Sequence, residues 1–137
     1  MSSKPWAIRD SVPGDHNFIS ATFLRGLYYG DSWFSLMRKD DFMVNYSSII
    51  EALLRNTNTR VKIACLKEDY DVILGYAILG SNDTLNWVYV KKDWRKLGIA
   101  NSLISRPVKT VTHLSELGKQ LLSKYQNCVF NPFKLGE

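Results

Sequence analysis

The sequence has few of the residues from which metal centres and disulfide frameworks are built. It contains two cysteines, Cys65 and Cys128, and two histidines, His16 and His113, which stand far apart in the chain. No Cys-x-x-Cys pair is present, so the sequence predicts no metal site. Isolated cysteines among apolar neighbours are typical of free, packed thiols, and the two histidines are expected to have ordinary polar or packing roles.

Long hydrophobic runs are also absent. Every apolar run is far shorter than the roughly 20 residues that a membrane-spanning helix needs. Residues 1–10 contain no apolar core of a secretory signal, so we expect a cytoplasmic protein with no membrane partner. A length of 137 residues suits one domain that spans residues 1–137.

The charge of the chain is moderately basic. Eighteen Lys and Arg residues stand against 13 Asp and Glu residues, which gives a formal net charge of +5. Such a balance attracts an anionic partner such as coenzyme A, nucleic acid or an acidic protein. The basic residues occur in short groups, including Lys91-Lys92 and Arg95-Lys96, and form no long basic tail, which weakens the case for nucleic acid.

Hydrophobic periodicity predicts ten elements in the order β-α-α-β-β-β-α-β-α-β. The predicted strands cover residues 6–9, 60–66, 72–79, 84–90, 108–114 and 128–133. The predicted helices cover residues 16–29, 40–56, 95–105 and 115–125. Asp15 is expected to be the N-cap of the first helix.

The spacing of these elements predicts an α+β fold. Short polar turns between residues 60 and 90 favour an antiparallel meander, and the strand–helix–strand unit over 84–114 favours one parallel junction. We therefore predict a mixed, mostly antiparallel sheet flanked by helices on both faces.

The segment 85–104 is the most informative part of the sequence. A strand ends at Val90, a basic turn follows, and Arg95-Lys96-Leu97-Gly98-Ile99-Ala100 opens a helix. Backbone N–H groups at a helix N-terminus lack intrahelical partners and carry partial positive charge, which suits a pyrophosphate. Gly98 and Ala100 let the backbone approach such a ligand, and Arg95 and Lys96 supply charge.

This segment resembles the signature of the GNAT superfamily of acyltransferases, which is Gln/Arg-x-x-Gly-x-Gly/Ala after a strand of the Val-x-Val type. Arg95, Gly98 and Ala100 match the three defining positions, and Val88 and Val90 match the strand. The order of elements is similar over nearly the whole chain. The resemblance implies an acetyl-CoA-dependent N-acetyltransferase that passes the acyl group directly to an amine, without a covalent enzyme intermediate.

The resemblance also implies how the acyl donor binds. Backbone amides from Leu97 to Asn101 would hold the pyrophosphate, and the strand at 88–90 would pair with the pantetheine arm. That strand and the next one, 108–114, would splay apart around the thioester, where a strand N–H stabilises the oxyanion. The implied CoA-binding residues are Val88, Tyr89, Val90, Arg95, Lys96, Leu97, Gly98, Ile99, Ala100 and Asn101.

The acid–base residues of the family match less well. Many relatives carry a carboxylate on the strand before the CoA loop, where this chain has Asn86, which can hold a water molecule but cannot act as a base. Relatives often place a Tyr on the last helix, and here Tyr125 is the first candidate and Ser123 the second. Half-exposed packing is the alternative for Tyr125.

The acceptor site is expected beside the connection between the first two helices. Tyr28, Tyr29 and Trp33 either line it or close the core, and Asp31 either pairs with a cationic amine or ends the loop. The acceptor is a small-molecule or protein amine. Two alternatives stay open: a relative that modifies nucleic-acid bases, which basic residues gathered beside the acceptor site would favour, and a non-catalytic CoA-binding or interaction domain. The chain is expected to be a monomer or a homodimer, with the sheet edge near residues 128–133 available for pairing.

Overall fold

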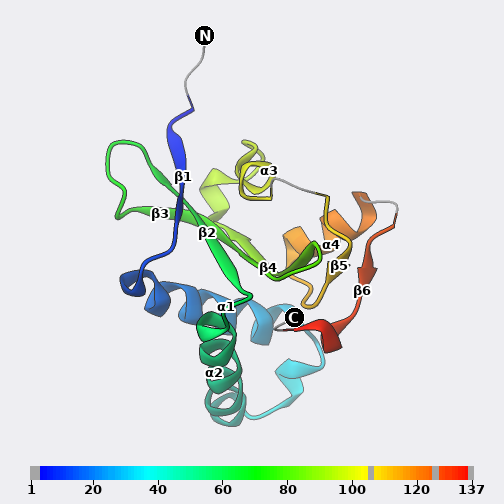
Figure 1. The fold of residues 1–137 in the computed structure, drawn as a ribbon. Helices are drawn as coiled ribbons and strands as arrows, with labels where there is room; N and C mark the ends of the chain where they lie inside the picture. Colours follow the sequence, from blue (N-terminus) through cyan, green and yellow to red (C-terminus); the bar gives the residue numbers. More distant parts are fainter. Residues whose placement is uncertain (1–3, 105–106, 125–126, 136–137) are drawn as a thin grey trace.

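A computed structural model describes residues 4–104, 107–124 and 127–135 of the chain. These residues form a six-stranded sheet with the order β1-β2-β3-β4-β5-β6. The strands are β1 (Trp6–Asp10), β2 (Arg60–Leu66), β3 (Ile73–Leu79), β4 (Thr84–Val90), β5 (Thr110–Val111) and β6 (Val129–Phe130), and the α-helices are α1 (His16–Gly30), α2 (Lys39–Arg55), α3 (Ile99–Leu103) and α4 (Glu116–Lys124). The predicted α+β fold is therefore confirmed (Figure 1).

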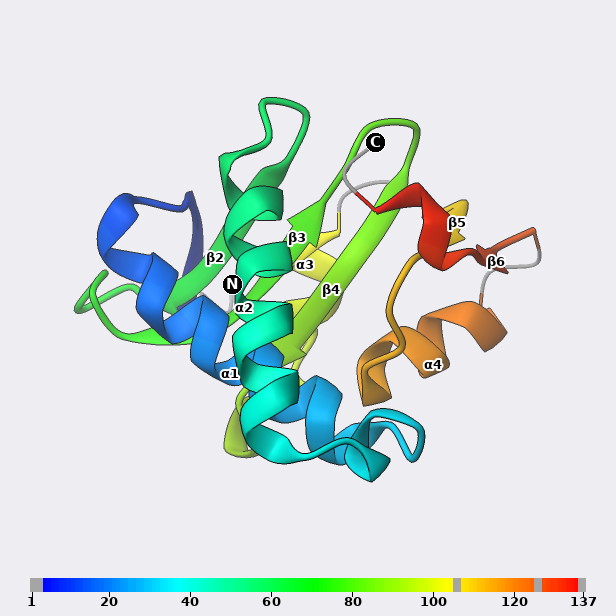
Figure 2. The ribbon, with the colours of Figure 1, turned by 90° about the horizontal axis from the view of Figure 1, so that it is seen from below.

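Helices cover both faces of the sheet, as the periodicity predicts. In Figure 2, α1 and α2 lie in front of β2, β3 and β4, while α3 lies behind them. One buried cluster joins α1 and α2 to the sheet, and a second joins α3 to the opposite face. Because both faces of β3 and β4 are buried, these strands consist almost entirely of apolar residues.

Helix α1 lies directly against the centre of the sheet. The Phe23 ring stacks on the Trp87 indole with 4.5 Å between ring centroids and 6° between planes. A Cβ atom at Gly26 would lie 2.9 Å from Trp87 Cζ2, so the glycine permits this approach. Thr22 Oγ1 and Tyr76 Oη lie 2.7 Å apart and link the same helix to β3.

Strands β2, β3 and β4 form the predicted antiparallel meander, and β1 pairs antiparallel with β2 across the two intervening helices. At the turn between β3 and β4, Asn82 and Asp83 both have φ 57°, a left-handed backbone that Asn and Asp tolerate better than other residues. The Gly80 N–H donates to Thr84 O at 2.8 Å and closes this turn. The prediction of a tight polar turn there is confirmed.

The carboxyl-terminal elements are shorter than predicted. The strand expected over 108–114 pairs only at Thr110–Val111, because the chain leaves the sheet after Val111. The strand expected over 128–133 is Val129–Phe130, and Pro132 starts a 3₁₀ turn that ends it. Strand β6 runs parallel to β5, which adds a second parallel junction to the one expected between β4 and β5.

Two predictions about helix starts need correction. The helix expected over 95–105 covers Ile99–Leu103, because the preceding residues form a loop. Asp15 stands at the N-cap position of α1 but makes no side-chain cap there. Its carboxylate instead accepts from Arg9 Nη1 at 2.7 Å and from the Val12 N–H at 2.8 Å, which ties the end of β1 to the turn before α1.

Within the part of the chain that the structure describes, no helix combines the length and the apolar character needed to cross a membrane.

Candidate functional site

Strand β4 contains a bulge at Asn86. Ile78 of β3 pairs with Trp87, whereas the next residue, Leu79, pairs with Leu85, so Asn86 is the extra residue in β4. The bulge changes which face each side chain reaches. Leu85 packs with α3, while Trp87 packs with α1 on the other face.

Strands β4 and β5 separate just beyond this bulge. Their ladder contains two residue pairs, Thr84 with Thr110 and Leu85 with Val111. The Thr112 N–H donates to Leu85 O at 3.0 Å, and the chain then turns toward α4 (Figure 2). The separation that the resemblance implies is therefore present.

The backbone groups of Val88 and Val90 face this opening. The Lys91 N–H donates to Leu74 O at 2.8 Å, toward β3. Because backbone groups alternate along a strand, those of Val88 and Val90 point to the other side. The Val90 carbonyl accepts from Arg95 Nε at 2.9 Å, which agrees with this direction.

A cavity of about 120 Å³, the slot, occupies the opening between β4 and the segment after β5. Gly26 and Gly30 of α1 form part of its wall, where the absence of side chains leaves room. The slot is lined by Gly26, Gly30, Trp87, Val88, Tyr89, Val90, Arg95, Leu114 and Ser115.

A second cavity, of about 280 Å³, adjoins the slot on the side of α3. The two cavities share Val90 and Arg95. Lys96 and Lys124 add positive charge to its lining, so a ligand that fills both cavities is expected to carry its anionic part here. The residues that line it are Val90, Trp94, Arg95, Lys96, Gly98, Ile99, Ala100, Asn101, Gln120 and Lys124.

The loop before α3 has an unusual backbone. Lys96 has φ 64° and Gly98 has φ 93°, so two of three successive residues are left-handed. Alternation of left-handed and right-handed residues turns successive N–H groups toward a common point, and many anion sites have this backbone arrangement. A left-handed lysine costs about 1–2 kcal/mol, and strain of this kind occurs often where a ligand is bound. Lys124 Nζ donates to Asn101 Oδ1 at 3.2 Å and links α4 to the start of α3.

The ten residues implied to bind CoA lie together in space. Val88, Tyr89 and Val90 line the slot, and Lys96 and Gly98 to Asn101 line the adjoining cavity, while Arg95 lines both. Leu97 is half exposed on the same loop. The structure thus groups these residues from β4 and the loop before α3 around two adjoining cavities that share Val90 and Arg95.

The predicted catalytic residues are not grouped in this way. Asn86 is fully buried at the bulge. Ser123 is exposed on α4, where its hydroxyl donates to Lys119 O at 3.1 Å. Tyr125 lies outside the described residues.

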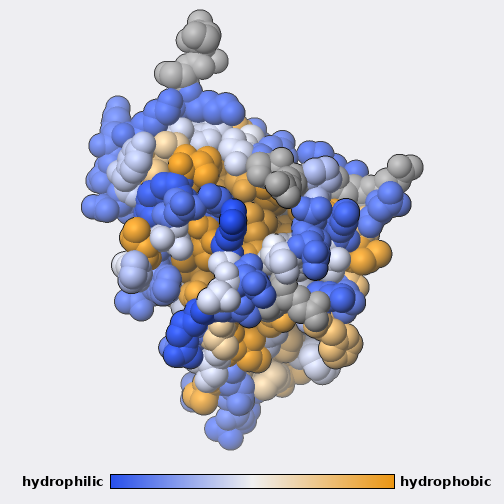
Figure 3. Space-filling model, viewed as in Figure 1, coloured by the Kyte–Doolittle hydropathy of each residue, from blue (hydrophilic) through white to orange (hydrophobic). Residues whose placement is uncertain are grey.

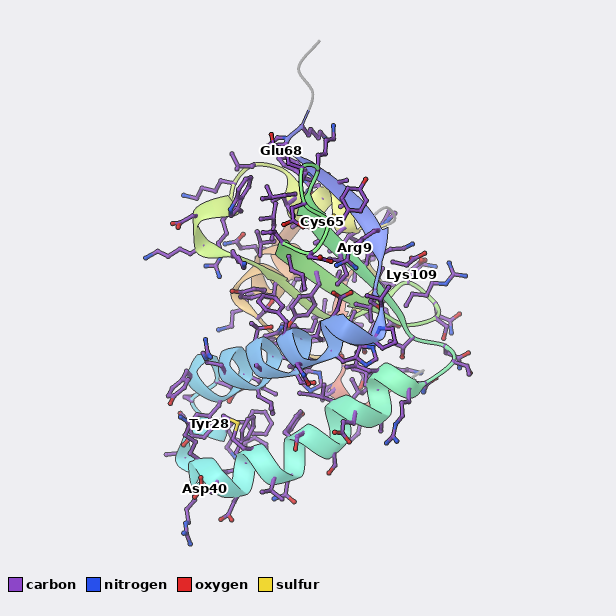
Figure 4. The ribbon with its side chains drawn as sticks, turned by 90° about the vertical axis from the view of Figure 1, so that its left-hand side faces the viewer. Arg9, Tyr28, Asp40, Cys65, Glu68 and Lys109 are labelled. Atoms are coloured by element: carbon purple, nitrogen blue, oxygen red, sulfur yellow. The ribbon has the colours of Figure 1, made fainter. Side chains whose placement is uncertain are left out.

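The predicted acceptor residues surround the connection between α1 and α2 without lining the slot. Tyr28 is buried and donates to Met37 O at 2.9 Å, and Figure 4 shows it between α1 and the start of α2. Tyr29 is 62% exposed. Asp31 Oδ1 accepts from the Trp33 and Phe34 N–H groups at 2.8 and 3.2 Å, so this carboxylate oxygen shapes the turn. Trp33 lines a separate cavity with Leu36 and Met37.

A buried polar chain that the sequence analysis did not anticipate runs beside the slot. Tyr46 Oη lies 2.7 Å from His113 Nε2, and His113 Nδ1 lies 3.1 Å from Thr112 Oγ1. The Thr112 hydroxyl donates to Asn86 Oδ1 at 2.9 Å. Burial lowers the pKa of His113 to about 4, and the Asp31 carboxylate opposes this shift. The imidazole is therefore neutral at pH 7.

A cavity larger than the slot and the basic cavity lies elsewhere. It has a volume of about 630 Å³ and is bordered by the turn between β3 and β4, the start of β2 and Val108. On the face drawn in Figure 3, hydrophilic side chains cover most of the surface around a central apolar hollow. Among the described residues, no group of three or more His, Cys, Asp and Glu side chains is arranged to hold a metal ion.

The overall arrangement is similar to that of solved acetyltransferase structures. A predicted acetyltransferase from Clostridium acetobutylicum, solved with acetyl-CoA, aligns with a TM-score of 0.61 at 17% identity, over 88% of this chain and 88% of its own. A proposed acetyl transferase from Pyrococcus furiosus aligns with a TM-score of 0.59 at 14% identity, over 92% of this chain and 81% of its own. A GCN5-related N-acetyltransferase from Rhodopseudomonas palustris aligns with a TM-score of 0.52 at 20% identity, over 90% of this chain and 70% of its own.

No protein-family model and no curated protein sequence matches the chain. The likeness is therefore one of structure, and it identifies the fold. The chain has the fold of the GNAT superfamily of acyltransferases, as the sequence predicts.

Proposed function

We propose that the protein is an N-acetyltransferase that binds acetyl-CoA and transfers its acetyl group directly to an amine. The observation that carries the proposal is that the slot and the basic cavity adjoin at Val90 and Arg95, which line both. A narrow, largely apolar slot suits a pantetheine arm and thioester. The basic cavity suits the phosphates of the same molecule. We also expect the activity to be cytoplasmic.

Each part of the site has a physical role in this proposal. The N–H groups that follow Lys96 and Gly98 would bind the pyrophosphate, and Arg95 and Lys124 would add long-range attraction. The Val88 and Val90 backbone groups at the open edge of β4 would bind the amides of the pantetheine arm as an added strand would. A strand N–H in the slot would then stabilise the oxyanion that forms when the amine attacks the thioester.

The distribution of charge favours an acceptor other than nucleic acid. Residues 91–101 around the basic cavity carry four basic side chains and one acidic side chain. Residues 25–41 beside the expected acceptor site carry three basic side chains and three acidic side chains. Because nucleic-acid binding depends on basic residues that contact phosphates, the acceptor side lacks the charge that this alternative needs.

Calorimetric titration with acetyl-CoA and CoA tests the proposal, with Gly98→Ala as the diagnostic variant and Gly14→Ala as its control. No atom lies within 4 Å of an added Cβ at either glycine, but only Gly98 has a left-handed φ. The strain of about 1–2 kcal/mol in the Gly98 variant is expected to weaken acetyl-CoA binding about tenfold. Gly14→Ala is expected to bind normally.

Turnover separates the enzyme from a non-catalytic CoA-binding domain. Release of free CoA thiol is followed with acetyl-CoA and a panel of primary amines. Thiol release that depends on the amine supports acyl transfer. Binding without turnover for any amine would favour the CoA-binding domain, and absence of acetyl-CoA binding to the unmodified protein would refute the proposal.

A further inference from the structure

We propose that Tyr46 removes the proton of the attacking amine and that His113 receives the hydroxyl proton of Tyr46 in the same step. The inference rests on the proposed function, because it concerns the amine acceptor of the proposed transfer. It supplies the proton acceptor that Asn86, in place of a strand carboxylate, cannot provide.

The hydrogen bonds of the buried chain fix the direction in which a proton can move. The Thr112 hydroxyl donates to Asn86 Oδ1, so Thr112 Oγ1 must accept from His113 Nδ1–H. A neutral imidazole carries one N–H, so His113 Nε2 must accept from the Tyr46 hydroxyl at 2.7 Å. Every donor in the chain therefore points away from Tyr46 Oη, whose own lone pairs stay available.

The buried polar chain, which consists of Asn86, Thr112, His113 and Tyr46, joins both walls of the slot. Asn86 precedes Trp87 of β4, and His113 precedes Leu114 on the segment after β5, and both of these neighbours line the slot. Asn86 and Thr112 are fully buried, so their contact holds the two walls together where they separate.

The Tyr46 end of the buried polar chain packs against the connection between α1 and α2, beside which the acceptor site is expected. The half-buried Tyr46 ring packs against Phe34 with 5.3 Å between ring centroids. The N–H of Phe34 belongs to the turn shaped by Asp31, which directly follows the slot residue Gly30. Burial, and after it the Asp31 carboxylate, raises the pKa of Tyr46, so the phenol is protonated at pH 7. Asp31 also opposes the effect of burial on His113 and would stabilise the imidazolium.

Acyl transfer through this relay moves two protons. The amine nitrogen forms a bond to the thioester carbon, and the C–S bond then breaks to release the CoA thiolate. The nitrogen of the adduct gives its proton to Tyr46 Oη, while Tyr46 gives its own proton to His113 Nε2. The thiolate takes a proton from solvent, and the imidazolium returns its proton through Tyr46 after the amide leaves.

The test compares Tyr46→Phe and His113→Gln with matched controls, Tyr70→Phe and His16→Gln, in the full chain. Tyr70 is exposed and its side chain is not part of the buried chain. Acetyl-CoA affinity and amine-dependent thiol release are measured with a panel of primary alkylamines and with hydroxylamine. The hydroxylamine adduct is acidic enough to lose its proton to water, so its reaction needs no base from the protein.

The relay predicts a selective defect. Tyr46→Phe and His113→Gln are expected to bind acetyl-CoA as the unmodified protein does and to lose about 10²-fold in kcat/KM with alkylamines, with little loss toward hydroxylamine. Equal losses toward both nucleophiles would reveal a structural role and overturn the inference. Unchanged alkylamine turnover in both variants would overturn it while leaving the proposed function intact. If acetyl-CoA binds but no alkylamine reacts, the relay has no acceptor to serve and the inference fails, whereas absence of acetyl-CoA binding refutes the proposed function itself.

Discussion

The close approach of β3 and β4 at Gly75 provides a sharp test of the described geometry. A Cβ atom at Gly75 would lie 2.5 Å from the Tyr89 carbonyl oxygen, 3.1 Å from Val90 Cα and 3.2 Å from Val90 Cγ2. Two of these atoms belong to the backbone of a buried strand, so a rotamer change cannot relieve the clash. Forcing extra atoms into a packed core costs about 1–3 kcal/mol, and we expect Gly75→Ala to lie near the upper end.

Urea denaturation followed by fluorescence measures this cost. With a typical m-value, a loss of about 2–3 kcal/mol lowers the midpoint by about 1–2 M. Gly14→Ala, where the added Cβ meets no atom within 4 Å, serves as the control and is expected to keep the midpoint. Because Tyr89 and Val90 line the slot, acetyl-CoA affinity should fall together with stability in Gly75→Ala. A midpoint equal to that of the unmodified protein would refute the reasoning about this contact.

Further predictions concern packing and pH. Phe23→Ala removes the ring that stacks on Trp87 and is expected to cost about 3–5 kcal/mol in the free energy of unfolding, measured by the same urea titration. The pKa of His113 is lowered to about 4 in the folded chain, so the unfolded chain binds more protons between pH 6.5 and 4, and stability should fall by about 3 kcal/mol as the pH drops through this range. His113→Gln should lack this fall, and parallel pH curves for the two proteins would contradict the assignment. The hydrogen bond from Arg9 lowers the pKa of Asp15, so this carboxylate stabilises the fold at neutral pH and its contribution disappears as the pH falls through its folded pKa. The difference in unfolding free energy between the unmodified protein and Asp15→Asn should therefore shrink toward acid pH.

The parts of the site that are contiguous in sequence could be predicted from the sequence. The basic loop lies within six residues, from Arg95 to Ala100, and directly follows a strand. The residue types that bind phosphate must therefore come together whatever the rest of the chain does. The alternation and turn residues between 60 and 90 likewise predict an antiparallel meander, because the partners in each hairpin are close in sequence.

The buried polar chain could not be predicted, because it depends on contacts between distant residues. Tyr46 and His113 are separated by 67 positions. On sequence alone Tyr46 belongs to the apolar stripe of α2, and His113 lies in an alternating segment that predicts a longer β5. The strand is short because Thr112 and His113 leave the ladder and bind Asn86 and Tyr46 instead. Only the packing of α2 against the end of β5 reveals the connection.

The acceptor side was equally beyond the reach of sequence patterns. Aromatic residues at a helix connection are compatible with a binding surface and with core packing alike. In the structure Tyr28 is buried and Trp33 is 72% exposed, although both belong to the same aromatic segment. Tyr28 lies on α1 and Trp33 lies in the connection after it, and composition does not distinguish these two environments.

The single extra residue at Asn86 also limits how this strand can change. Leu85 and Trp87 are two positions apart and would share a face in a regular strand, yet they reach opposite faces here. Removal of Asn86 itself would make Leu85 and Trp87 adjacent, and adjacent residues of a regular strand point to opposite faces, so the Trp87 indole would still face α1. With Asn86 present, side chains after the bulge alternate between the two faces in the opposite order to side chains before it. A one-residue insertion after Trp87 would instead exchange the faces of Val88, Tyr89 and Val90, which line the slot.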